Sequence, residues 1–275
     1  MMRLIHWFSC VLKRMAKRRQ LCLAAWLIAC SGVALAGVMA DRTRVIFSDG
    51  AQAQSVTLVN TNDYPVMLQI WVDNGEGSSI PDTIVSSMFV MPAVFRLQSH
   101  EVKSIRVLYT GDVLPAGRES LSWLNLYEIP ILPAGDQNND TPRVLLGLNT
   151  QIKIFYRPEG LQAPAGSIAT ALDFQIRRKD EQWFVVCHNR SAYFASFGGM
   201  AVQAGDRQYP IQQLPDMMTP PMGEGVYPIA AEVGVRFDRI SASLNYTLID
   251  DSGNLVAGAA KLNAVISADS AANKE

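Results

Sequence analysis

Cysteine is scarce in this chain of 275 residues. Three of its four cysteines, Cys10, Cys22 and Cys30, lie within the first 36 residues, so only Cys187 remains beyond them. One cysteine cannot form an internal disulfide, and a secreted domain without disulfides must depend on its hydrophobic core. Cys187 ends the apolar run 183–187, which predicts a buried structural thiol rather than a reactive one.

Histidine and catalytic motifs are scarce as well. Beyond residue 36 the only histidines are His100 and His188, and no nucleophile elbow, phosphate loop, dinucleotide fingerprint or His-Glu-x-x-His motif occurs. We therefore expect no enzyme activity, no cofactor and no metal. Met217, Met218 and Met222 invite a copper(I) interpretation, but methionines that fill gaps in an irregular loop explain them better.

Positive charge is concentrated at the start of the chain. Residues 1–36 hold six of the 24 basic residues and none of the 25 acidic ones, so their removal leaves a net charge of −7. The basic cluster precedes the apolar run 21–37, and Ala34-Leu35-Ala36 fits a signal-peptidase site. The sequence predicts a signal peptide over residues 1–36 and a secreted, acidic product that does not bind nucleic acid.

Alternatives remain open at this end of the chain. Cleavage after Ala40, lipidation at Cys30 and translation from Met15 are each compatible with the sequence. The apolar run is short and rich in small residues, which disfavours a stable membrane span.

The remaining chain lacks any long helical period and consists of short β-prone segments separated by turn signals. Such a pattern predicts an all-β fold of antiparallel sandwiches. The segments expected as strands are 43–47, 54–60, 66–73, 102–109, 119–129 and 143–156, then 171–177, 182–188, 192–197, 199–204, 227–229, 233–237, 243–249 and 255–262.

The chain is expected to form two domains. Arg157-Pro158-Glu159-Gly160 and the Pro/Gly-containing stretch 163–166 mark a boundary between the two sets of strands. We predict one sandwich over residues 37–160, a second over 161–266 and a small, polar, flexible tail over 267–275.

The most informative segment runs from Arg143 to Pro158. Val144, Leu146 and Leu148 alternate, so a strand places them on one face, and Lys153 falls on the other face. A strand that is apolar on both sides is either buried in a core or presents one side to a partner.

Three blocks of sequence carry a resemblance to a known family. They are residues 41–47, the run Arg118-Glu-Ser-Leu-Ser-Trp-Leu-Asn-Leu-Tyr-Glu-Ile-Pro130 and Lys153-Ile-Phe-Tyr-Arg-Pro158. In this order they resemble the first domain of PapD-like periplasmic pilus chaperones. The resemblance implies two immunoglobulin-like sandwiches in an L or boomerang arrangement, and a periplasmic protein of the chaperone–usher pathway.

The resemblance also implies partners. A chaperone of this family binds pilus subunits by donor-strand complementation, lending the strand that the subunit lacks, and delivers them without ATP to an outer-membrane usher. An exposed strand also invites pairing between two copies, so a self-capping homodimer is a further expectation.

By the same resemblance, residues acquire roles. Val144, Leu146 and Leu148 would be the lent side chains, and Arg44 and Lys153 would bind the carboxylate at the end of the subunit. Glu119, Arg157 and Asp251 would form an ionic set between the domains, although the neighbouring Asp250 is an alternative to Asp251. Pro92 lies where the family has a cis bond, in a stretch where Ala93 and Ser99-His100 depart from the family pattern.

A different class of function stays open beside this one. A secreted or lipid-tethered immunoglobulin-like module, acting as an adhesin or as a structural subunit of a fibre, would also be an all-β protein without a catalytic motif.

Overall fold

The computed structural model describes residues 37–48, 50–75, 86–131, 146–161, 168–179, 181–232, 235–237 and 241–267. The chain divides into a short unit, Met1–Gly37, and a large one, Val38–Glu275, which holds every described strand. The predicted signal peptide, with Cys30 and Ala36, lies outside the described residues. Ala40, the alternative cleavage position, is the last residue of a strand.

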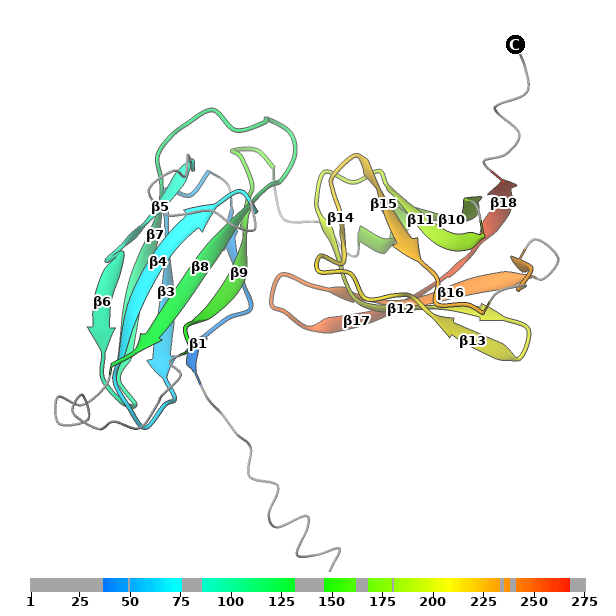
Figure 1. The fold of residues 1–275 in the computed structure, drawn as a ribbon. Coiled ribbons are helices and arrows are strands. Elements are labelled where there is room, and N and C mark those ends of the chain that lie inside the picture. The colour runs from blue at the N-terminus through cyan, green and yellow to red at the C-terminus, as the bar shows by residue number, and fades with distance from the viewer. Residues whose placement is uncertain are drawn as a thin grey trace, which may run out of the picture. The chain divides into compact units, whose positions relative to one another are not determined.

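The first sandwich consists of two sheets (Figure 1). One has the strand order β1-β3-β7-β5, and the other has the order β2-β9-β8-β4-β6. All pairs in these sheets are antiparallel except β2 with β9. The strands are β1 (Val38–Ala40), β2 (Arg44–Phe47), β3 (Ala53–Asn60), β4 (Val66–Asp73), β5 (Met88–Met91), β6 (Val94–Leu97), β7 (Val102–Tyr109), β8 (Ser120–Pro130) and β9 (Leu148–Tyr156).

Alternating apolar residues build the core of this sandwich. Val56 and Leu58 of β3 are fully buried, as is Leu124 of β8, because successive residues of a strand point to opposite faces. The inward side chains of the two sheets form one cluster, which β9 joins through Ile152, Ile154 and Tyr156.

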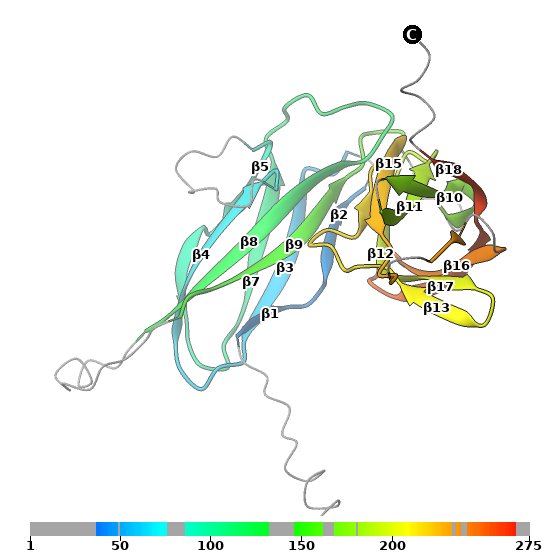
Figure 2. The same cartoon turned by 45° about the vertical axis from the view of Figure 1, so that its right-hand side comes forward.

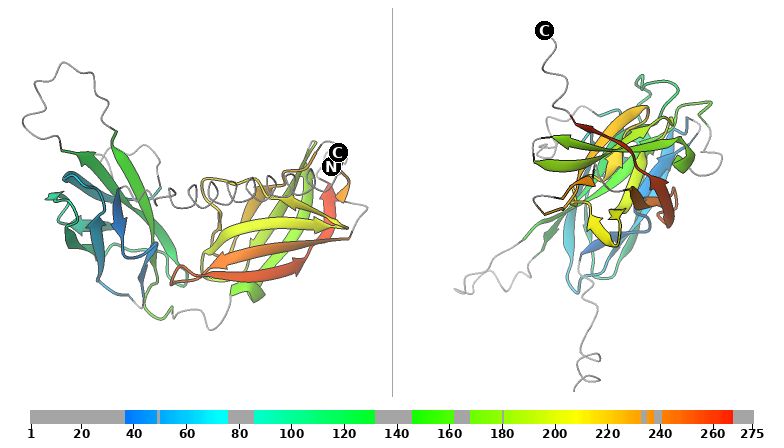
Figure 3. Two further views of the ribbon diagram at one scale, coloured as in Figure 1. Left: turned by 90° about the horizontal axis from the view of Figure 1, so that it is seen from below. Right: turned by 90° about the vertical axis from the view of Figure 1, so that its right-hand side faces the viewer.

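The second sandwich also has two sheets (Figures 1 and 3). Their orders are β15-β11-β10-β18 and β13-β12-β16-β17, with β14 paired to β12. The strands are β10 (Leu172–Lys179), β11 (Gln182–Asn189), β12 (Ala195–Ala204), β13 (Arg207–Pro210), β14 (Met218–Thr219), β15 (Gly223–Pro228), β16 (Ala242–Ile249), β17 (Leu255–Lys261) and β18 (Asn263–Ser267), preceded by the 3-10 helix η3 (Ile168–Ala171).

Aromatic rings and Cys187 fill the core of the second sandwich. Phe197 packs edge-on against Tyr227 and Tyr246, with ring centroids 5.7 Å and 5.9 Å apart. Cys187 is completely buried, as the sequence predicts, and burial raises the pKa of its thiol to about 11. Met217 belongs to the same core, whereas Met222 is largely exposed.

Each sandwich has a buried asparagine at the end of one strand that hydrogen-bonds to loop carbonyl oxygens. The buried Asn60 ends β3 and donates from its amide to the carbonyl oxygens of Tyr64 and Gln98. The buried Asn189 ends β11 and donates in the same way to Tyr193 and Pro220. Each asparagine therefore satisfies loop carbonyls that the core would otherwise leave without partners.

The strand predictions need four corrections. The expected strands 192–197 and 199–204 form the single strand β12, which has a register shift between Phe197 and Gly199. Of the expected strand 143–156, residues 143–145 lie outside the described part of the chain, residues 146 and 147 are not in a strand, and β9 begins at Leu148. The strands β1, β5, β6, β13, β14 and β18 were not expected, and β18 extends to Ser267, the residue at which the tail was expected to begin.

The fourth correction concerns the segment 233–237, whose described part is not a strand. Its alternating apolar residues look like a strand in the sequence. In the structure Phe237 is buried without belonging to a strand, and its ring centroid lies 5.4 Å from that of Trp183. Core packing thus requires the apolar side chain there without requiring a strand.

Candidate functional site

Strand β9 is paired differently along its two edges. Its antiparallel pairing with β8 covers the whole strand, from Leu148 opposite Glu128 to Tyr156 opposite Ser120. The parallel pairing with β2 covers only residues 153–156. Among the described strands nothing pairs with the outer edge of residues 148–152, so this half of β9 offers free backbone groups. Figure 2 shows β8 and β9 side by side.

The face of β9 that carries the predicted donor residues changes character along the strand. Ile154 and Ile152 are buried in the core, with exposed fractions of 0% and 4%. On the same face farther up the chain, Leu148 is 51% exposed, and Leu146, just before the strand, is 70% exposed. Val144 lies outside the described residues. Two apolar side chains therefore stand in solvent beside an unpaired strand edge, which is typical of a surface awaiting a partner.

Arg44 and Lys153, the predicted carboxylate-binding pair, are direct neighbours in the structure. Their Cα atoms are partners at the start of the parallel ladder between β2 and β9. The Arg44 side chain is buried over the Phe155 ring, and its Nη1 donates a hydrogen bond of 3.3 Å to the carbonyl oxygen of Ile249. No described atom accepts a hydrogen bond from its Nε.

One donor of the buried Arg44 side chain, Nε, remains available for an anionic ligand. Burial lowers the pKa of this guanidinium, and the nearby carboxylates of Asp251, Asp250 and Glu119 oppose that effect. A buried cation with an unused donor gains most from a further carboxylate, because a charge-assisted hydrogen bond would restore the lost solvation.

Lys153 already contacts a carboxylate. Its Nζ lies 2.6 Å from Oδ1 of Asp216, which precedes β14 in the second sandwich, and 5.0 Å from the centre of the Trp123 ring. The two charged side chains are 20% and 42% exposed. Sequence reasoning missed Asp216, since no motif marks this loop residue and only the fold brings it to Lys153.

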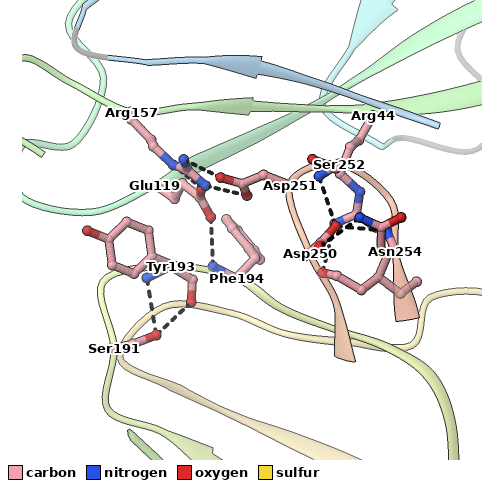
Figure 4. Close-up of polar contacts among 11 residues, drawn as sticks. Arg44, Glu119, Arg157, Ser191, Tyr193, Phe194, Asp250, Asp251, Ser252 and Asn254 are labelled. Carbon is pink, nitrogen blue, oxygen red and sulfur yellow. Dashed lines mark hydrogen bonds and ion pairs between the residues drawn. The ribbon is translucent and has the colours of Figure 1, made fainter. Parts of the chain in front are cut away.

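Glu119, Arg157 and Asp251 form one ionic set (Figure 4). Arg157 Nε donates to Glu119 Oε1 at 2.7 Å, and its two Nη atoms donate to the two oxygens of Asp251, also at 2.7 Å. The sequence left Asp250 as an alternative to Asp251. In the structure Asp250 instead accepts hydrogen bonds from the backbone of Ser252 and Asn254 in its own turn.

Burial affects the pKa values of Glu119 and Arg157. It raises the pKa of Glu119, against the lowering effect of the Phe194 N–H, which donates to Oε2 at 2.8 Å, and of Arg157. Burial also acts to lower the pKa of Arg157, but Asp251 and Glu119 outweigh it, so that pKa is raised. The Arg157 guanidinium lies over the Tyr193 ring at 5.4 Å and is almost completely enclosed.

A cavity of about 380 Å³ adjoins Arg44 and the ionic set of Glu119, Arg157 and Asp251. It contains two cations, Arg44 and Arg157, together with three carboxylates and an apolar wall. Its lining consists of Arg44, Glu119, Phe155, Arg157, Ile168, Tyr193, Phe194, Leu248, Ile249, Asp250, Asp251, Ser252 and Val256.

One further predicted feature can be located. The Met91–Pro92 peptide bond is cis, at the proline that the sequence singled out. Among the described residues no group of three or more His, Cys, Asp or Glu side chains could hold a metal ion, and no helix there is long and apolar enough to cross a membrane. Fold and site together define a protein of two immunoglobulin-like sandwiches that has, among its described strands, an unpaired strand edge leading to two adjacent cations.

Comparison with known proteins agrees with this class. The family model described as "Pili and flagellar-assembly chaperone, PapD N-terminal domain" matches residues 37–162, and "Pili assembly chaperone PapD, C-terminal domain" matches residues 168–260. The chain is 28% identical over 236 residues to the probable fimbrial chaperone YadV of Escherichia coli K12, which covers 86% of this chain and 94% of that protein. With the probable fimbrial chaperone YfcS of the same organism it is 36% identical over 150 residues, 54% and 56% of the two chains.

Solved structures give the same result. The crystal structure of the YadV chaperone superposes with a TM-score of 0.65 at 28% identity, covering 82% of this chain and 99% of that one. The CupB2 chaperone of Pseudomonas aeruginosa superposes with a TM-score of 0.65 at 26% identity, covering 82% and 100%. The chain belongs to the PapD-like family of pilus-assembly chaperones. It is a periplasmic fimbrial chaperone and not an enzyme.

Proposed function

We propose that this protein lends β9 to pilus subunits and anchors their terminal carboxylate between Arg44 and Lys153. One observation carries the proposal: exposed Leu146 and Leu148 stand beside the unpaired edge of a strand that leads directly to two adjacent cations. An extended client can use all three features at once, through backbone hydrogen bonds, apolar contacts and an ionic anchor.

The direction of the client follows from the order of these features. The anchor lies at the carboxyl end of the free edge, and a client's own carboxylate is the last group of its chain. The client strand therefore runs parallel to β9, with its preceding residues along 148–152. From Leu146 to Lys153 this path is about 23 Å long, at roughly 3.3 Å per residue.

Apolar burial would supply much of the affinity. Each of Val144, Leu146 and Leu148 could contribute roughly 1.5–3 kcal/mol when covered by a client, before the cost of ordering both chains. The client's carboxylate would accept a charge-assisted hydrogen bond from Arg44. It would also replace Asp216 as the ion-pair partner of Lys153.

The ionic set supports the same function from a distance. Arg157 follows β9 directly and joins the first sandwich to Asp251 of the second. We propose that this contact, with Glu119, fixes how the sandwiches are placed relative to each other. Delivery to an outer-membrane usher and release by exchange for a better-fitting subunit strand complete the proposal, together with self-capping of free chaperone by a second copy.

The test begins with the tagged protein isolated from the periplasm of its host, with mass spectrometry of the proteins that accompany it. A synthetic peptide with the sequence of the captured protein's final strand is then made twice, with a free carboxylate and with a terminal amide. We expect the free acid to bind about tenfold to a hundredfold more tightly, since hydrogen bonds to charged groups are worth about 1.5–3 kcal/mol.

Variants assign that difference to the site. Lys153→Ala should remove most of the preference for the free acid, whereas Lys179→Ala, which removes an exposed strand lysine of the second sandwich, should keep it. Equal binding of acid and amide by the wild-type protein would refute the carboxylate anchor. Failure to capture any β-rich subunit would count against the lending of β9.

A further inference from the structure

On the outward face of β9, opposite to the donor face, side chains are matched by side chains of β8, the neighbouring strand of the same sheet. The Lys153 ammonium lies over the Trp123 ring, and the side chains of Gln151 and Asn149 both reach Asn125. At Gly147 the Tyr127 hydroxyl leaves no room, because a Cβ there would lie 2.5 Å from its oxygen. Every odd-numbered position from 147 to 153 is thus matched to a side chain of β8.

Asn125 is the centre of this arrangement. Its Oδ1 accepts hydrogen bonds from Gln151 Nε2 at 2.8 Å and from Asn149 Nδ2 at 3.1 Å. Its Nδ2 donates to Asp73 Oδ2 at 2.8 Å and to the carbonyl oxygen of Trp123 at 3.3 Å. Asn125 and Asp73 are almost completely buried, with 1% and 2% of their surfaces exposed.

The chain of hydrogen bonds has a fixed direction. The Asp73 carboxyl group also accepts from the backbone N–H of Gly75 and from the indole N–H of Trp71, so three donors converge on it. Asn125 must therefore turn its NH₂ towards Asp73 and its oxygen towards β9. Donors on β9 satisfy that oxygen, and Asn149 and Gln151 each supply one.

Residues 148–151 keep the backbone ladder with β8 but lack the burial that specifies register in the rest of β9. All four are exposed, and no described strand pairs with their outer edge. Hydrophobic burial specifies register in a core strand, where a shift of one residue would exchange its two faces. In this half of β9 the same shift would move Leu148 to the outward face and Asn149 to the donor face.

We propose that Asn125 is a positioning residue for the lent strand. Through its hydrogen bonds with Asn149 and Gln151 it fixes the register of residues 147–152. Leu146 and Leu148 are therefore already oriented for client binding in the free protein. The inference rests on the proposed function only for the identity of that client. The holding of the strand is a property of the free protein.

The first experiment therefore uses the free protein. Amide hydrogen exchange of residues 148–152 is compared between wild type, Asn125→Ala, which removes the acceptor, and Gln151→Glu, which replaces an amide donor by a carboxylate. Gln151 is exposed, so its variant should fold even if Asn125→Ala does not. We expect exchange at 148–152 to accelerate about tenfold or more in either variant, with residues 153–156 unchanged.

The control is Gln208→Glu, the same change at an exposed strand glutamine of the second sandwich, which should leave exchange in β9 as in wild type. Two results would overturn the proposal. Exchange at 148–152 could remain within about twofold of wild type in Gln151→Glu, or it could rise equally along all of β9, which would indicate general destabilisation.

The second experiment measures binding of the captured subunit's terminal-strand peptide to wild type and Gln151→Glu. Slower association with Gln151→Glu is expected, because the strand must first adopt its register. Unchanged binding alongside faster exchange would refute preorganisation for the client. If the peptide does not bind wild type either, the proposed function fails while the exchange experiment still decides whether Asn125 holds the strand.

Discussion

Strands β9 and β11 occupy similar places in their sandwiches but are paired differently. Both have neighbours on two sides. β11 pairs with β10 along its whole length and with β15 from Phe184 to Asn189, and Val185, Val186 and Cys187 in its middle are fully buried. β9 has two neighbours only over residues 153–156, and its first four residues are exposed.

This difference in pairing shows which parts of these strands contribute to stability and which part carries the proposed function. A strand that is paired on both edges and buried, such as β11, contributes mainly to the core. The second half of β9 does the same, while the first half keeps an open edge and exposed leucines, features that a fold maintains only at a cost in solubility. That half has no second neighbouring strand among the described strands. Its hydrogen bonds to Asn125 of β8 hold it in position instead.

The largest expected effect comes from the buried half of β9. Ile154→Ala should lower the free energy of unfolding by about 2–5 kcal/mol, because it opens a cavity at a fully buried position. Leu148→Ala, at a position 51% exposed on the same face, should change it by less than about 1 kcal/mol but weaken client binding. Urea denaturation of both variants measures the difference.

Leu255→Ala, which truncates an exposed leucine of β17, is the matched control for Leu148→Ala. It should leave both stability and client binding close to wild type. Similar losses of stability for Ile154→Ala and Leu148→Ala would contradict the division of β9 into two halves.

The next largest effect is the pH dependence of stability that arises from Cys187 in β11. The Cys187 thiol has an ordinary pKa of 9.0, raised by burial to about 11 in the folded protein. Its contribution to stability is therefore fully present below pH 9 and is lost as pH rises through about 11. Two pKa units correspond to about 2.7 kcal/mol, to be measured by urea denaturation in reducing buffer at pH 8 and pH 11.

Burial also raises the pKa of Tyr227, so the wild-type curve alone is not diagnostic. The quantity to compare is the loss of stability between the two pH values in wild type and in Cys187→Ala. A loss of the same size in both proteins would show that the thiol does not remain protonated in the core.

The smallest effect concerns the cation at the junction of the two halves of β9. Asp216→Asn leaves Lys153 without its carboxylate partner, so we expect affinity for a peptide with a free carboxylate to rise a few-fold. Stability should change by less than about 1 kcal/mol, because both side chains are partly exposed. Calorimetric titration with the acid and amide forms of the peptide measures the change.

Asp206→Asn, at an exposed turn aspartate, controls for the change in net charge. An equal gain in affinity from Asp206→Asn would indicate a long-range charge effect and not release of Lys153. An unchanged affinity in Asp216→Asn would mean that the client does not displace Asp216 at all.

Much of the fold could be predicted because local patterns carried it. Alternation located β3, β4, β7 and β8 within a few residues, since their inward side chains form a continuous core. The short strands β6 and β14 offered too few residues for any period. The segment ending in Phe237 was wrongly predicted as a strand, because the Phe237 side chain packs into the core without belonging to a strand.

By itself the sequence determined the family, the all-β class and the residues of the two charged groups, because these depend on residue types in short blocks. Only the tertiary structure brought Asp216 to Lys153, placed Asp251 rather than Asp250 on Arg157, and joined Asp73 through Asn125 to β9. These contacts join residues from 24 to 94 positions apart. No local pattern specifies such pairs, since side-chain hydrogen bonds act over about 3 Å and only chain folding brings their partners within that range.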